Sequence, residues 1–180
     1  HVGPISLKMR WNPDAIGEIE TVKGELPFNV DLRQISMFGA TWTLGMINQL
    51  VKAKADRATF FETVGSRGLM QAEHPAFPDL FPAKSGQLYP VFWLFQQILS
   101  NKSSAFRVVE SSDPLSFTGL AYENKQAKTI LLGSFSRKEI GIAIPEEFQQ
   151  GKMTILTVDD MMKFGESGDL ESGSYPIGGK

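Results

Sequence analysis

The sequence predicts an α/β region of barrel type, followed by an all-β region. Two runs with strand character, residues 5–11 and 58–62, stand on either side of a long helical pattern, which is the order of a strand–helix–strand unit. Ionisable side chains stand where both strands end, and in a (β/α)8 barrel that end carries the chemistry. Beyond residue 105, short strand-like runs alternate with turn signals, a pattern typical of an antiparallel β-sandwich.

The first strand is expected at Ile5–Met9, where apolar and polar residues alternate. If Ile5, Leu7 and Met9 pack outward against helices, then Ser6, Lys8 and Arg10 point into the barrel.

A helix is expected over Gln34–Ala55, because apolar residues recur there at three- and four-residue steps. They are Ile35, Phe38, Trp42, Met46 and Leu50. Asp31 precedes Gln34 by three residues and resembles the carboxylate of a capping box. We favour this capping role over that of a catalytic acid.

The second strand, Ala58–Glu62, places Glu62 at its carboxyl end. We expect Glu62 to face the barrel interior, because an outward carboxylate would be buried without a partner. Arg10 and Glu62 then lie at the same end of a parallel strand pair joined by a right-handed crossover.

The rest of the chain is expected to contain a proline-rich loop, one helix and several short strands. Prolines exclude regular structure from residues 71–87, whereas Pro90 suits the start of a helix that reaches Leu99. The expected strands are Phe106–Val109, Ser116–Tyr122, Thr129–Phe135, Ile140–Ile144 and Thr154–Val158.

Composition excludes several classes of function. A net charge of −2 and the absence of a basic cluster argue against nucleic acid. No apolar run approaches the ~20 residues of a membrane span, so we expect a soluble protein, with a cytoplasmic location slightly favoured. With no cysteine and two histidines, thiolate chemistry is excluded, and we expect no metal site.

Glu62 is the predicted catalytic residue, since a carboxylate at a barrel mouth can act as general base, general acid or nucleophile. The alternative is a structural ion pair with Arg10 or Arg67. Arg10, Arg33, Arg67 and His74 are the predicted substrate-binding residues, although a solvated Arg33 and a surface His74 are open alternatives. Trp42 fits the apolar stripe, which favours core packing over sugar stacking.

Three segments resemble D-apionate lactonase-like proteins. They are Pro4-Ile-Ser-Leu with Arg10 and Asn12-Pro13, then Val30-Asp-Leu-Arg-Gln with Ala40-Thr-Trp-Thr-Leu-Gly, then Thr59-Phe-Phe-Glu-Thr-Val-Gly-Ser-Arg-Gly. The resemblance implies the last two units of a TIM barrel followed by a β-sandwich, hydrolysis of a sugar-acid lactone or a related carbohydrate, and no organic cofactor. The first strand ends in Arg10-Trp11 rather than Glu, which argues against a retaining glycosidase mechanism.

We therefore expect the C-terminal part of a TIM-barrel catalytic domain at residues 1–104, and a β-sandwich at 105–180 whose tail from Gly165 is mobile. A whole barrel needs roughly 250 residues, so the expected partners are the other barrel units of the same protein and a small carbohydrate or sugar acid. The alternative is a non-catalytic carbohydrate-binding or structural sandwich module. That alternative is disfavoured because the sandwich aromatics fall at core positions (Phe106, Phe117, Tyr122 and Phe135).

Overall fold

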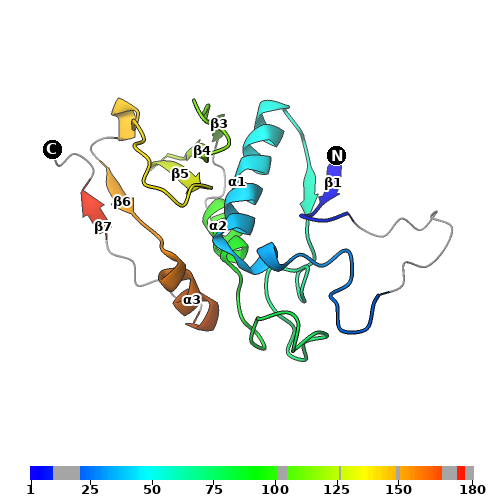
Figure 1. Cartoon of the computed structure of the whole chain (residues 1–180). Helices are drawn as coiled ribbons and strands as arrows, with labels where there is room; N and C mark the ends of the chain where they lie inside the picture. The colour runs from blue at the N-terminus through cyan, green and yellow to red at the C-terminus, as the bar shows by residue number, and fades with distance from the viewer. Residues whose placement is uncertain (10–20, 101–104, 126, 149–150, 168–173, 177–180) are drawn as a thin grey trace.

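The computed structural model describes residues 1–9, 21–100, 105–125, 127–148, 151–167 and 174–176. Within them, helix α1 (Met37–Lys52) lies between a parallel strand pair and a three-stranded antiparallel sheet (Figure 1). None of the helices in this part of the chain is both long and apolar enough to cross a membrane.

Strands β1 (Val2–Ile5) and β2 (Ala58–Phe60) form the parallel pair, with Val2 opposite Ala58 and Ile5 opposite Phe60. The chain returns between them through α1, so the predicted parallel strand–helix–strand arrangement is confirmed.

Both strands end earlier than predicted. β1 stops at Ile5 because the Ser6 hydroxyl donates a hydrogen bond of 2.7 Å to the carbonyl of Lys8 and closes a turn. β2 stops at Phe60 because Phe61 has a φ of 43°, which interrupts strand geometry. The predicted strand at Ile5–Met9 was therefore wrong, and Met9 is 75% exposed rather than packed under a helix.

The predicted helix Gln34–Ala55 is divided in two. A 3-10 turn, η1, covers Leu32–Ile35, and Ser36 then adopts an extended backbone and caps α1. The Ser36 hydroxyl accepts a 3.4 Å hydrogen bond from the amide of Gly39, satisfying a donor at the first turn. Helix α1 consequently begins at Met37 and ends at Lys52.

The most buried face of α1 is not the predicted apolar stripe. Phe38 of that stripe is exposed, while the buried positions of α1 are Gly39, Thr41, Thr43, Leu44 and Asn48. Thr43 can be buried because its hydroxyl donates a 2.7 Å hydrogen bond to the carbonyl of Gly39. Thr41, Leu44 and Asn48 lie on the side of α1 that meets the antiparallel sheet, where Thr41 is next to Gly133 and Asn48 binds Val109, whereas Gly39 and Thr43 lie on the other side of the helix.

Helix α2 (Pro90–Ser100) confirms the predicted helix that starts at Pro90. A first hydrophobic core lies beneath the loops that follow the parallel strands. The core comprises Val30, Phe61, Phe81, Ala83, Tyr89 and Val91, with Trp42 of α1 packed against it. The proline-rich segment 71–87 has no helix or strand, as predicted, yet it contributes Phe81 and Ala83 to this core.

The antiparallel sheet has the order β3 (Ala105–Val108), β4 (Phe117–Glu123), β5 (Lys128–Ser134). These strands confirm three of the predicted ones within a residue or two. The sheet packs on α1, and a second core of Leu44, Leu94, Ile98 and Leu120 joins it to both long helices. Pairing of this sheet with a second one, as in a sandwich, stays a prediction.

The remaining elements differ from the predicted strands. Residues 140–144 are irregular rather than a strand, and η2 (Glu146–Phe148) follows them. β6 (Lys152–Thr154) ends where the predicted strand Thr154–Val158 begins, and α3 (Val158–Ser167) occupies the next residues. Thr157 and Asp160 account for this difference, because the Asp160 carboxylate accepts a hydrogen bond of 2.8 Å from the amide of Thr157 at the helix start. β7 (Ser174–Pro176) pairs with β6, so regular structure continues past Gly165, where the sequence predicts a mobile tail.

Candidate active site

The loops that follow β1 and β2 lie at the same end of the parallel pair, towards the bottom of the molecule in Figure 1. Residues 6–31 follow β1 and residues 61–89 follow β2. Arg33, on η1 just after the first loop, and Glu62, Arg67 and His74 on the second therefore reach one end of the fold. This is the end where barrel enzymes carry their functional groups. Arg10 belongs to the first loop by sequence but lies outside the described residues.

Glu62 follows the irregular residue at the end of β2. Phe61 is held in its left-handed conformation because its ring is buried and its amide donates a 3.0 Å hydrogen bond to the carbonyl of Ile5. Such a conformation costs a bulky residue on the order of 1–3 kcal/mol and tends to be kept at functional positions. Strand alternation stops here, so the predicted inward parity does not by itself orient Glu62.

Arg67 is the observed partner of Glu62. Its guanidinium lies 2.7 Å from Glu62 Oε1, and both side chains are about one-third exposed. The amide of Glu62 also donates a 3.2 Å hydrogen bond to the carbonyl of Arg67, so the backbone and the side chains close the same short loop. The predicted proximity of Glu62 to Arg10 stays a prediction.

Two glycines shape the loop between Glu62 and Met70. Gly65 has a φ of +102°, and a Cβ on Gly68 would lie 2.8 Å from the backbone of Val64, so both positions favour glycine. Two buried polar side chains then anchor the loop. The Tyr89 hydroxyl donates to the carbonyl of Gly65 at 3.3 Å, and Gln34 Nε2 donates to the carbonyl of Gly68 at 2.7 Å.

The contact of Gln34 connects the two halves of the site, because Gln34 belongs to η1, which also carries Arg33. Its side chain is buried and turned toward the second loop. The sequence pairs Gln34 with Asp31 in a capping box, and this half of the prediction was wrong, since the amide group binds Gly68 instead.

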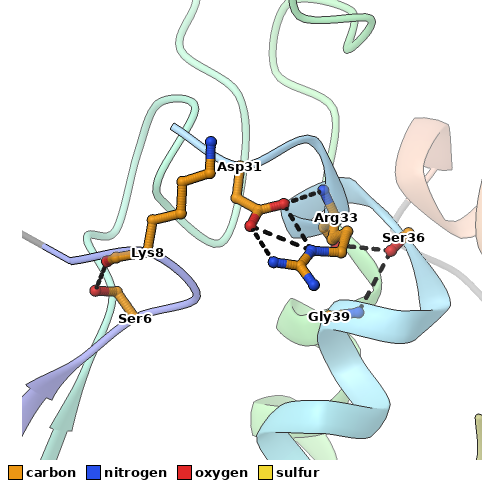
Figure 2. Close-up of polar contacts among 6 residues, drawn as sticks. All are labelled: Ser6, Lys8, Asp31, Arg33, Ser36 and Gly39. Atoms are coloured by element: carbon orange, nitrogen blue, oxygen red, sulfur yellow. Dashed lines mark hydrogen bonds and ion pairs between the residues drawn. The ribbon is translucent and has the colours of Figure 1, made fainter. Parts of the chain in front are cut away.

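Asp31 and Arg33 form a close ion pair (Figure 2). Arg33 Nη2 lies 2.6 Å from Asp31 Oδ2, and Arg33 Nε lies 3.0 Å from Oδ1. Oδ1 also accepts the amide of Arg33 at 2.9 Å, which confirms Asp31 as the cap of this helical turn. The hydrogen bonds from Arg33 hold the pKa of the Asp31 carboxyl below its usual value, although burial opposes this shift in part.

Arg33 also meets an aromatic ring. Its guanidinium carbon lies 5.2 Å from the centroid of the Phe38 ring, within the range of a cation–π contact. The Phe38 ring in turn packs against Phe135, with ring centroids 5.5 Å apart. Phe135 directly follows β5. The chain that leaves the antiparallel sheet therefore packs against Phe38, the ring that Arg33 contacts.

An open groove of about 760 Å³ runs along the end of β1. Its lining is polar at one part, with Ser6, Lys8 and Arg67, and apolar elsewhere, with Pro4, Ile5, Met9, Trp42 and Met46. Trp42 thus contacts both the core and the groove, so it can present an apolar face to a ligand while its packing is retained.

The structure places the predicted site residues unequally around this groove. Arg67 lines it and Glu62 is bound to Arg67, whereas Arg33 is not among the groove residues, although its neighbour Gln34 binds Gly68 of the loop that carries Glu62 and Arg67. His74 is exposed and is not among the groove residues.

The sequence analysis did not select Lys8 as a site residue, although it lines the groove. The feature that could have identified Lys8 as a site residue is its position between β1 and the first loop. Among the described residues, no group of three or more His, Asp or Glu could hold a metal ion.

A parallel strand–helix–strand unit with charged side chains on the loops beyond its strands is the building unit of TIM-barrel proteins. Residues 1–103 match the family described as D-apionate lactonase, TIM barrel domain. The match covers more than half of the chain, and the chain belongs to this family. No curated protein and no solved structure matches it. The family points to a carbohydrate-related hydrolase.

Proposed function

We propose that this chain is part of an enzyme that hydrolyses a sugar-acid lactone, with Glu62 as general base. The observation that supports the proposal best is the Glu62–Arg67 pair, 2.7 Å apart, on the loop beyond two parallel strands. It stands in a chain that belongs to a lactonase barrel family. Arg67 holds the carboxylate in place, as a general base requires.

The proposed reaction needs one water molecule. Glu62 accepts a proton from that water as its oxygen bonds to the lactone carbonyl carbon, which leaves a negative charge on the carbonyl oxygen. The ring C–O bond then breaks, the ring oxygen takes up a proton, and a hydroxy acid is released. Arg67 and Arg33 are proposed to bind the oxygen-rich substrate, since the Arg33 side chain remains 53% exposed despite its ion pair. Arg10 and His74 keep their predicted substrate-binding role as part of the proposal.

The partners proposed for this chain are further barrel units. A closed barrel of this type has eight strands, and the described residues supply two parallel ones. We propose that βα units from the same protein complete the barrel and contribute further groups to the site. A test of the activity therefore requires the full-length protein.

The test is the substitution Glu62→Gln, which preserves shape and removes the basic carboxylate. We expect turnover of a panel of aldonolactones to fall by on the order of 10²-fold or more, with a thermal midpoint close to that of the wild type. Glu73→Gln is the matched control, because Glu73 is an exposed carboxylate on the same connection, and it should retain full activity.

Normal turnover of Glu62→Gln with a lowered melting temperature would contradict the proposal. Glu62 would then be a structural ion-pair residue, which is the alternative role that the sequence allows. Aryl glycosides in the same panel test whether the enzyme is a glycosidase instead.

The competing proposal, a carbohydrate-binding module on the antiparallel sheet, has weaker support. Tyr122 is buried, as predicted, but Phe106 is 41% exposed, so the prediction that it lies in the core was wrong. Phe106 lies at the sheet edge on β3 and packs edge-on against Tyr122, with ring centroids 6.1 Å apart. One partly exposed ring that already has an aromatic partner is a poor sugar-stacking platform.

A further inference from the structure

Three cationic side chains in the described part of the chain belong to the predicted site or line the groove, and two of them are already bound to carboxylates. Arg33 contacts both oxygens of Asp31, and Arg67 contacts Glu62. Lys8 is the third. It is exposed, lines the groove, and forms no ion pair with any residue that the structure describes. Lys8 is therefore the cation of this set that remains available to a ligand.

The surroundings of Lys8 limit how its ammonium group can be neutralised from within the protein. Asp31 is the nearby carboxylate whose pKa Lys8 helps to lower, but both Asp31 oxygens are engaged by Arg33 (Figure 2). Among the described residues of this set, three cations stand against the two carboxylates of Asp31 and Glu62, which leaves one positive charge in excess. A positive excess beside a groove attracts anions.

The backbone at Lys8 is held in place, which favours binding over a merely solvated side chain. The Ser6 hydroxyl donates to the Lys8 carbonyl at 2.7 Å, and the neighbouring Leu7 packs against the first core. Lys8 thus stands on a fixed turn beside a groove whose lining is otherwise largely apolar, formed in part by Trp42 and Met46. A fixed backbone reduces the conformational entropy that is lost on binding.

We infer that Lys8 binds the carboxylate of a sugar acid, with the carbon chain of that acid lying along Trp42 and Met46. This inference rests on the proposed function, because opening of a lactone produces such a carboxylate. Lys8 would therefore set the affinity of the enzyme for the ring-opened acid. It is a binding residue in this account, and the general base remains Glu62.

The test compares two ligands that share one carbon skeleton, D-apionate and its uncharged amide, D-apionamide. Isothermal titration calorimetry with the full-length protein should show tighter binding of D-apionate to the wild type. In Lys8→Gln this preference for the anion should fall by about 10-fold or more, since a charge-assisted hydrogen bond is lost. Lys8→Arg should retain the preference.

Lys54→Gln is the matched control, because it removes the same charge from the far end of α1, where the helix ends and β2 begins. It should leave the preference for D-apionate unchanged. Added salt should weaken binding of D-apionate to the wild type more than binding of D-apionamide.

Three results would overturn the inference. The first is equal affinity of the wild-type protein for D-apionate and D-apionamide, a measurement that needs no variant. The second is an unchanged preference in a folded Lys8→Gln protein. The third is loss of the preference in Arg67→Gln but not in Lys8→Gln, which would assign the anion to Arg67.

Failure of the proposed function would look different. A wild-type protein that hydrolyses no lactone, yet prefers D-apionate through Lys8, would remove the lactonase proposal and leave the anion site standing. A wild-type protein that hydrolyses lactones but shows no preference for D-apionate over D-apionamide would remove the anion site and leave the lactonase proposal standing.

Discussion

Asp31 has two roles that the structure combines in one carboxylate. Its Oδ1 accepts the Arg33 amide at 2.9 Å and so caps η1, while both of its oxygens bind the Arg33 guanidinium. The side chain is 8% exposed, against 53% for Arg33. A buried carboxylate with an exposed partner depends on that partner to remain ionised.

The pH dependence of stability should reflect this pair. The folded-state pKa of Asp31 is lowered, so the pair stabilises the fold above the unfolded pKa of about 3.9. That contribution is lost as the pH falls through the lower folded-state pKa. Asp31→Asn keeps a capping oxygen but loses the charge, and should cost about 0.5–1 kcal/mol at pH 7.

Urea denaturation at pH 7 and at pH 3 provides the measurement. The loss of stability between these two values should be smaller for Asp31→Asn than for the wild type, because the substituted side chain does not titrate. Asp79→Asn, which alters an exposed carboxylate, serves as the control. An unchanged difference between pH 7 and pH 3 in Asp31→Asn would show that the pair contributes nothing to acid sensitivity.

At the scale of elements, Asn48 joins α1 to the segment that follows β3. Its Nδ2 donates to the carbonyl of Val109 at 2.8 Å, and its Oδ1 accepts the amide of Val109 at 2.9 Å. One side-chain amide thus satisfies both backbone polar groups of one residue, as a neighbouring strand would do. This contact spans residues that are far apart in sequence and fixes the sheet against the helix.

Substitutions at Asn48 should therefore destabilise the protein. Asn48→Ala leaves both groups of Val109 without that partner and should cost about 1–3 kcal/mol. Asn48→Asp is nearly isosteric, yet it replaces the donor with a carboxylate that faces the Val109 carbonyl, so we expect it to be at least as harmful as Asn48→Ala.

Chemical denaturation monitored by circular dichroism tests the order of these effects. Gln49→Ala, at the exposed neighbouring position on the same helix, should remain within about 0.5 kcal/mol of the wild type. Wild-type stability in Asn48→Asp would mean that the two hydrogen bonds carry little of the helix–sheet contact.

At the scale of the whole molecule, one core connects the parallel region to the antiparallel sheet. Leu44 of α1, Leu94 and Ile98 of α2, and Leu120 of β4 form it. Leu120 is completely buried. Because helices from the first region and a strand from the second share these contacts, the two regions should unfold together.

Leu120→Ala tests this coupling. Removal of a fully buried leucine side chain should cost about 2–5 kcal/mol, depending on how far the cavity collapses. Scanning calorimetry should show one transition at a lower temperature than in the wild type. Leu115→Ala, at a position that is 88% exposed, should leave the transition in place. Two separate transitions, with only one shifted by Leu120→Ala, would show that the regions fold independently.

The sequence predicted the elements whose signal is local. Pro90 indicated the start of α2, and Asp31 indicated a helix start. Three antiparallel strands followed from alternation and turn residues. These elements were predicted correctly because capping, proline geometry and turn residues act within a few residues of one another.

The errors arose where the outcome depends on distant contacts. The predicted stripe of α1 was apolar, but its buried positions include Thr43 and Asn48, since a polar residue can be buried once Gly39 or Val109 satisfies it. Alternation likewise could not show that Ser6 ends β1 or that Phe61 ends β2, because a local hydroxyl contact and a buried ring decide these points.

By itself, the sequence determined that this protein has a parallel strand–helix–strand unit with Glu62 and several arginines beyond its strands, and a resemblance to D-apionate lactonase-like proteins. The family match over residues 1–103 confirms that resemblance. The tertiary structure alone decided that Glu62 pairs with Arg67, that Arg33 is bound to Asp31, and that Lys8 lines the groove without an ion pair among the described residues. The physical reason is that composition and periodicity record which charges exist, whereas the distances between loops decide which of them neutralise one another.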